Sequence, residues 1–128
     1  MKRSIGESQA NYQRKLDLGL DLMRLDIPAA QRVADWVCST KTMVAVEVQP
    51  GREAAYKNGS WHRRDSRCYI SLNPRGQTLA TLLHELAHRA QWCSQLPVAH
   101  DRGFKQLHAK MIDLFGLEML EVMRDGHQ

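Results

Sequence analysis

The stretch His84-Glu85-Leu86-Ala87-His88 is an H-E-x-x-H pattern set inside a run of apolar residues with helical spacing. On an α-helix, residues four positions apart lie on the same face, with roughly 5–6 Å between their Cβ atoms. The two histidines can therefore reach one metal ion, and Glu85 lies beside them. Two neutral imidazoles suit Zn²⁺, which acidifies a water molecule so that a neighbouring carboxylate can take its proton. The pattern predicts a zinc helix with Glu85 as general base.

The predicted zinc helix extends beyond the pentapeptide on both sides. Thr78 has the side chain of an N-cap, and apolar residues recur three and four positions apart over residues 79–93. This spacing predicts a buried stripe on a helix that ends near Gln95. Pro97 stops the helix, because proline lacks the backbone N–H that a helix interior needs.

Helical patterns also open and close the chain. Dense apolar positions over residues 7–25 predict a first helix, and Asp26 looks like the cap of a second helix over residues 29–38. A final helical region is expected over residues 101–123, with an interruption at Gly116.

Between these helices the apolar period changes to two. Residues 43–48 are β-branched and strand-like, and Asn58-Gly59 is a hairpin turn signal between short strands at 54–57 and 60–63. A further strand is predicted at residues 67–72, before the break at Asn73-Pro74. We expect a small antiparallel sheet. The fold class is therefore α+β: two N-terminal helices, the sheet, the zinc helix and C-terminal helices.

Length and composition predict a single domain and a cytoplasmic protein. The 128 residues predict a single domain over residues 1–128, and there is no 18-residue apolar run. Because the start of the chain turns polar at once, we expect no signal peptide, no membrane partner and a cytoplasmic protein. Cys38, Cys68 and Cys93 are too widely spaced for a zinc ribbon or a disulfide framework, which predicts reduced, buried thiols.

A catalytic zinc site needs a third protein ligand and an open position. His100 is the best candidate: the proline break lets the chain reverse, and four or five extended residues at about 3.3 Å each reach back to the metal. His108 is a weaker candidate, and a surface or indirect role suits it better. Glu118 and Glu121 would suit a glutamate ligand. Asp101 could instead orient a ligand histidine.

Three segments follow one another in an order that is typical of one group of zinc proteases. They are Ile70-Ser71-Leu72-Asn73-Pro74, the H-E-x-x-H pentapeptide, and His100-Asp101-Arg102-Gly103-Phe104. With its L-N-P and H-[GD]-x-x-F elements, the chain resembles the SprT/Spartan-like and WLM zinc metalloproteases over about residues 68–110. The resemblance implies a zincin-like minimal protease core that hydrolyses peptide bonds in protein substrates. It also implies one Zn²⁺ per chain held by His84, His88 and His100, with Phe104 packing to anchor the last helix.

Other readings of the motif stay open. The ImmA/IrrE-like regulatory proteases also place helices and a small sheet before an H-E-x-x-H helix, but they expect a downstream glutamate ligand in an E-x-x-A-x-x-F-A-like run. We find no such run here. A zinc-binding interaction module without catalysis, or a DNA-binding protein in which zinc is structural, would use the same histidines.

DNA is the partner that one further stretch suggests. Trp61-His62-Arg63-Arg64, followed by Arg67, combines an aromatic ring that can stack on a base with groups that neutralise phosphates. The net charge of +4 adds a weak preference for acidic partners. A core tryptophan flanked by solvated arginines on an edge strand explains the stretch equally well. Trp61, Arg63 and Arg64 are the candidate DNA contacts, and the oligomeric state stays open.

Overall fold

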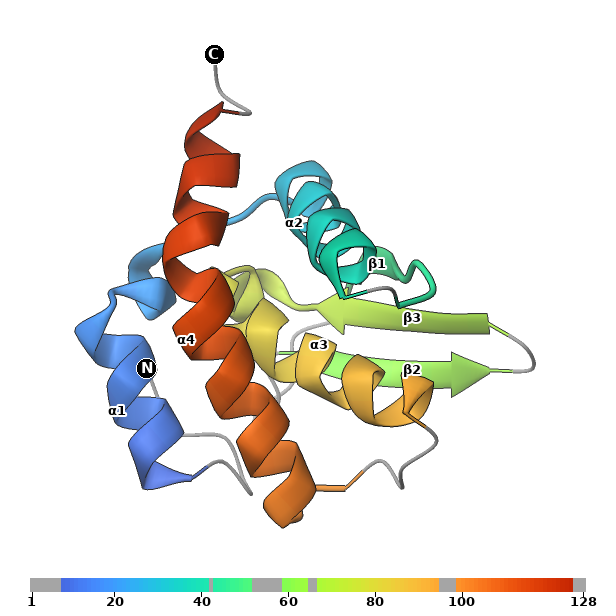
Figure 1. Ribbon diagram of the computed structural model, residues 1–128. Coiled ribbons are helices and arrows are strands. Elements are labelled where there is room, and N and C mark those ends of the chain that lie inside the picture. Colours follow the sequence, from blue (N-terminus) through green and yellow to red (C-terminus); the bar gives the residue numbers. More distant parts are fainter. Residues whose placement is uncertain (1–7, 42, 52–58, 65–66, 95–98, 126–128) are drawn as a thin grey trace.

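The computed structural model describes residues 8–41, 43–51, 59–64, 67–94 and 99–125; for 59–64, 67–68 and 114–125 the description covers the backbone. These residues form four α-helices and one three-stranded sheet, an α+β fold as predicted (Figure 1). The helices are α1 (Gln9–Asp17), α2 (Ile27–Thr40), α3 (Leu79–Cys93) and α4 (Arg102–Asp125). The strands are β1 (Glu47–Pro50), β2 (Gly59–Arg64) and β3 (Arg67–Leu72), and the short 3-10 turns are η1 (Leu20–Leu22) and η2 (Pro74–Gly76).

The sheet is mixed, so the prediction of a purely antiparallel sheet is wrong. Its strand order is β1-β3-β2: β2 pairs antiparallel with β3, whereas β1 pairs parallel with β3, from Glu47 opposite Tyr69 to Pro50 opposite Leu72. Alternation along a strand determines which side chains share a face, but the path of the connecting chain determines strand direction. The strand predicted at 54–57 lies outside the described residues.

The strand predicted at residues 43–48 begins four residues later, at Glu47. The cause is Arg89 of α3, whose buried guanidinium donates to the carbonyl of Val44 at 2.9 and 3.2 Å and to that of Ala45 at 3.2 Å. These carbonyls are bound to a helix side chain and not to a neighbouring strand. Arg89 thereby holds residues 44–45, which precede β1, against α3.

The first predicted helix is broken, and the last one is not. α1 ends at Asp17 because Gly19 has a left-handed backbone with φ of 70° and leads into η1. α2 begins as predicted at Asp26, whose side chain accepts a hydrogen bond from the backbone N–H of Ala29 at 2.8 Å. α4 continues through Gly116 without the expected interruption, since a glycine inside a helix costs only about 1 kcal/mol relative to alanine.

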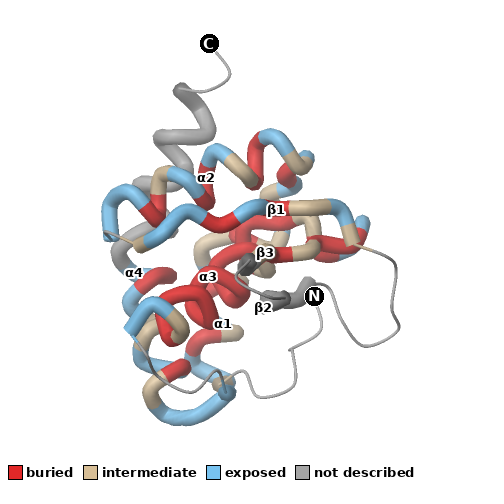
Figure 2. Tube along the Cα trace, turned by 90° about the vertical axis from the view of Figure 1, so that its right-hand side faces the viewer, coloured by how far each residue is buried: buried red, intermediate tan, exposed pale blue. Residues whose placement is uncertain are grey.

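The zinc helix predicted from the sequence is α3, and it lies in the middle of the molecule. It packs against α4, α2, η1 and strands β2 and β3, and it is almost wholly buried (Figure 2). Thr78 caps it as predicted, by accepting from Thr81 N–H at 3.3 Å. A short antiparallel bridge fastens the same end, because Leu25 N–H donates to Gln77 O and Leu79 N–H to Met23 O.

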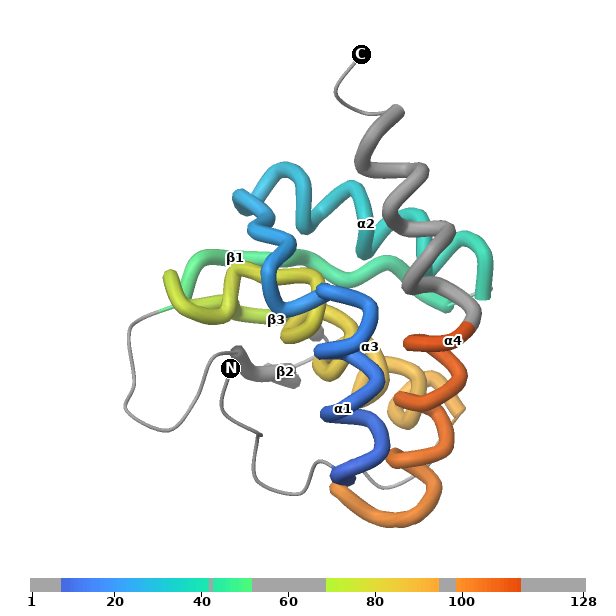
Figure 3. The backbone as a smooth tube through the Cα atoms, turned by 90° about the vertical axis from the view of Figure 1, so that its left-hand side faces the viewer, coloured from blue at the N-terminus to red at the C-terminus, as the bar shows by residue number. Residues whose placement is uncertain are grey.

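The remaining helices enclose α3. α1 lies alongside α4, and α2 lies along β1 (Figure 3). The core between them is built from fully buried aliphatic side chains such as Leu82, Leu86 and Ile70. Among the helices of the described residues, none combines the length and the apolar character needed to cross a membrane.

The cysteines are only partly as predicted. Cys38 of α2 is a buried free thiol, and burial raises its pKa to about 11. Cys93 is free but exposed, because it is the last residue of α3. The side chain of Cys68 lies outside the described part of the structure.

Candidate metal centre

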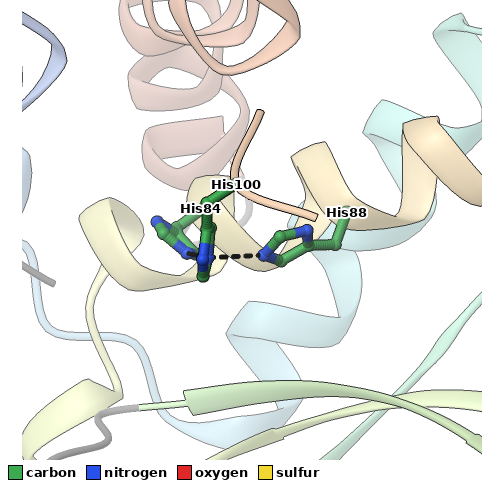
Figure 4. Close-up of side chains that lie close together, drawn as sticks. All are labelled: His84, His88 and His100. Carbon is green, nitrogen blue, oxygen red and sulfur yellow. Dashed lines mark hydrogen bonds between the residues drawn. The ribbon is translucent and has the colours of Figure 1, made fainter. Parts of the chain in front are cut away.

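Three histidine side chains converge beside the middle of α3 (Figure 4). α3 supplies His84 and His88, and the segment that precedes α4 supplies His100. The Nε2 atom of His100 lies 3.1 Å from Nε2 of His88 and 3.3 Å from Nε2 of His84. The structure thus brings together the three residues that the sequence singled out, although eleven residues separate His100 from His88 along the chain.

The two distances from His100 Nε2 fit a shared cation. With bonds of about 2.0–2.1 Å, two ligand atoms of a tetrahedral metal lie about 3.3–3.4 Å apart, close to the distances found here. Hydrogen bonds alone do not explain the arrangement, because Nε2 of a neutral His100 has either one N–H or one in-plane lone pair and so makes a well-aligned hydrogen bond with only one of its two neighbours. The group could hold a metal ion.

The site favours neutral imidazoles, which is the form that binds metals. Burial, assisted by the nearby charge of Lys15, lowers the pKa of His84 to about 2. Burial also lowers the pKa of His88, and the hydrogen bond from that ring to Gln91 acts in the opposite direction. Protons therefore do not compete with a metal for His84 and His88 near neutral pH.

Phe104 forms one wall of the site. Its ring is fully buried in the first turn of α4 and stacks on His88, with centroids 4.4 Å apart and an angle of 17° between the planes. The same ring meets His84 at 4.9 Å and His100 at 5.1 Å, both edge-on. The residue that the family resemblance implied as a helix anchor contacts all three imidazoles.

His108 lies behind the site, one helical turn after Phe104. It is fully buried, with ring centroids 5.2 Å from His84 and 5.4 Å from Phe104, so the alternative of a surface histidine is wrong. The described group of converging nitrogen atoms contains His100 and not His108. Burial and the charge of Lys15 lower the pKa of His108 to about 2.

The carboxylates predicted near the site differ in their positions and contacts. Glu85 lies beside His84 on α3 and is buried. Asp101 does not contact a histidine directly: its Oδ1 accepts from Phe104 N–H at 2.9 Å, which caps α4, and from Gln91 Nε2 at 3.4 Å. The side chains of Glu118 and Glu121, the alternative ligands, lie outside the described part of the structure.

The candidate DNA contacts are located only through the backbone. Trp61, Arg63 and Arg64 belong to β2, where they pair with Ile70, Cys68 and Arg67 of β3. Since β2 has β3 as its one partner in the described sheet, the three residues lie on an edge strand. Their side chains lie outside the description.

Two buried residues near the site were missed in the sequence. Gln91 is fully buried and binds His88, and Lys15 of α1 is buried near His84 and His108. A polar residue three positions after His88 in an otherwise apolar stripe is a signal that could have identified Gln91. Lys15 gave no such signal, because its proximity to α3 depends entirely on how α1 packs.

Searches among protein-family models, curated proteins and solved structures found no significant match to this chain.

Proposed function

We propose that this chain is a zinc-dependent metallopeptidase in which His84, His88 and His100 hold Zn²⁺ and Glu85 is the general base. The observation that carries the proposal is the convergence of three imidazole nitrogens on an H-E-x-x-H helix, with the glutamate of the motif adjacent. Three protein ligands and one open position are typical of catalytic zinc sites, whereas structural sites have four protein ligands.

The donor set favours zinc over the hard cations. Mg²⁺ and Ca²⁺ take oxygen ligands, and the described group consists of imidazole nitrogens. His84 and His88 are buried and His100 is exposed, so a substrate can approach from the side of His100. Three protein ligands would leave a bound zinc one position for a reactant.

Zinc held by His84, His88 and His100 would supply Lewis acidity, which would lower the pKa of a water molecule and polarise the carbonyl of the scissile peptide bond. Glu85 accepts the proton of that water as its oxygen adds to the carbonyl carbon. The carboxylic acid of Glu85 then returns the proton to the amine nitrogen as the C–N bond breaks. The buried ring of Phe104 covers the face of His88 on which it stacks and keeps water away from that face.

The order of motifs supports a peptide substrate. L-N-P, H-E-x-x-H and H-D-x-x-F follow one another as in the SprT/Spartan-like and WLM zinc metalloproteases that the chain resembles. Asn73 of the first motif is buried and caps η2 by accepting from Gly76 N–H at 2.7 Å, which starts the turn that leads to α3. The first motif thus supports the entry to the zinc helix, and the third supplies His100 and Phe104.

The test of the proposal is the substitution Glu85→Gln. We expect the variant to keep about one zinc per chain by elemental analysis and to lose cleavage of an unfolded protein such as reduced casein by roughly 10²- to 10⁴-fold, the usual contribution of a general base. Glu47→Gln, which changes an exposed glutamate of β1, is the matched control and should cleave like the wild type.

A wild-type protein that holds one zinc per chain but cleaves none of a panel of unfolded proteins would contradict the peptidase. The alternative would then be a zinc-binding module without catalysis. Single-stranded DNA binding that weakens with salt and with Arg63→Ala/Arg64→Ala would favour a DNA-binding version of that module.

A further inference from the structure

Gln91 is a fully buried amide on α3 with no role in the proposed reaction. Its Oε1 lies 2.9 Å from Nδ1 of His88. Its Nε2 donates to the backbone carbonyl of Ala99 at 2.9 Å and approaches Oδ1 of Asp101 at 3.4 Å. One side chain therefore joins the zinc helix to the residues on both sides of His100.

These contacts determine the orientation of the amide. A backbone carbonyl can only accept, so the NH₂ group of Gln91 must face Ala99 and its oxygen must face His88. That oxygen also only accepts, so Nδ1 of His88 must carry the proton. Nε2 of His88, which lies 3.1 Å from Nε2 of His100, is then the nitrogen with the free electron pair.

The other half of the amide acts on the third histidine. His100 is exposed and lies just before α4, and its ring contacts His84, His88 and Phe104. Gln91 binds the residue before it and the residue after it. Asp101 in turn caps α4 through Phe104 N–H, and the Phe104 ring stacks on His88. The contacts form a closed circuit that begins and ends at His88.

We propose that Gln91 is a positioning residue that assembles the metal site before the metal arrives. It selects the His88 tautomer whose Nε2 can bind a metal, and it holds the segment of His100 against α3. The inference rests on the metal site of the proposed function, but it requires no peptidase activity. Groups that orient metal-bound histidines typically contribute 10- to 100-fold to metal affinity.

The first measurement needs no variant. In the metal-free wild-type protein, the ¹⁵N chemical shifts of the His88 ring should show a protonated Nδ1 and an unprotonated Nε2. A ring protonated at Nε2 would overturn the proposal by itself. This readout is independent of metal and of activity.

Two substitutions separate the two halves of the amide. Gln91→Leu removes both, and should weaken zinc binding by roughly 10- to 100-fold in competition with a chromogenic chelator and release the His88 tautomer. Gln91→Glu keeps an acceptor for Nδ1–H, so the His88 tautomer should stay. The carboxylate cannot donate to Ala99 O or to Asp101 Oδ1, so the cap that Asp101 forms with Phe104 N–H should loosen and the hydrogen exchange of that N–H should accelerate.

Gln31 provides the matched control. Its side chain makes a similar bridge from α2 to the chain around the start of β1, since Nε2 donates to Val46 O at 2.9 Å and Oε1 accepts from Val48 N–H at 2.7 Å, and no histidine is among its described hydrogen-bond partners. Gln31→Leu should leave zinc affinity within twofold of the wild type. If Gln91→Leu has the zinc affinity and the His88 tautomer of the wild type, the role of Gln91 is refuted and the peptidase proposal is untouched. If Gln91→Leu binds zinc more weakly than Gln31→Leu but the wild type cleaves no protein, the peptidase proposal is refuted and the role of Gln91 stands.

Discussion

The two faces of α3 are equally buried, yet they differ in what stabilises them. At about 100° per residue, Leu82 and Leu86 lie opposite His84 and His88 around the helix. Each fully buried leucine contributes about 1.5–3 kcal/mol through its apolar surface alone. The histidine face buries ring nitrogens instead, and Nδ1 of His84 has no hydrogen-bond partner in the described part of the structure.

The difference teaches which face was shaped by folding and which by function. A buried polar atom without a partner costs about 1–3 kcal/mol, so a face chosen only for stability would not gather three imidazoles. Polar groups held in place against this cost are common at functional sites. The leucine face is complete without a ligand, whereas the histidine face carries a group that could hold a metal ion.

Removal of one histidine should produce the largest effect. In His88→Ala we expect zinc affinity to fall by roughly 10²- to 10³-fold, since each ligand contributes about 3–4 kcal/mol to a strong zinc site. The measurement is chelator competition at neutral pH, with circular dichroism to show that the helices persist. His108→Leu is the control, because its ring lies outside the group of converging nitrogens; zinc retained in His88→Ala and lost in His108→Leu would reverse the ligand assignment.

Truncation on the opposite face should change stability and leave the metal in place. Leu86→Ala should lower the free energy of unfolding by about 2–5 kcal/mol, because it leaves a cavity in the aliphatic core. Urea denaturation of the zinc-loaded and metal-free proteins measures the loss. Below the unfolding transition the variant should still bind one zinc per chain, and a loss of zinc from the folded variant would show that the two faces are not independent.

Acid should lower the stability that depends on the histidine face and leave the contribution of the leucine face unchanged. The folded-state pKa values of His84 and His108 lie near 2, well below 6.5, so the unfolded chain takes up protons that the folded chain does not. Their contribution to stability is fully present above pH 6.5 and is lost as the pH falls below it. For the metal-free protein we expect a loss of at most about 1.4 kcal/mol per pH unit for each of the two residues.

Urea denaturation of the metal-free protein at pH 7, 6 and 5 gives the slope. In His108→Leu the slope should fall by the share of one residue, whereas Leu86→Ala should shift the whole curve and keep its slope. A stability of the wild type that is constant from pH 7 to pH 5 would mean that these histidines are not buried in the neutral form.

Local signals were the reliable part of the sequence. The caps at Asp26 and Thr78, the strand from Arg67 to Leu72 and the helical spacing of His84 and His88 all depend on residues close together in the chain. His100 was predicted because a proline break after α3 limits where the chain can go. Each of these predictions needed only the geometry of one helix, strand or turn.

Long-range contacts decided the features that the sequence missed. The parallel pairing of β1 depends on the path between strands, and its late start depends on Arg89, more than forty residues away. The break in the first helix followed from the left-handed conformation of Gly19, which a glycine permits but does not demand.

The sequence by itself determined that His84 and His88 share a face with Glu85 beside them, because a helix fixes the spacing of residues within one turn. Only the tertiary structure decided that His100 Nε2 lies 3.1 and 3.3 Å from the Nε2 atoms of His88 and His84 and that the Phe104 ring contacts all three imidazoles. The physical reason is that these contacts join α3 to His100 and to α4, so their geometry is set by how the two helices pack and not by the residues of either helix alone.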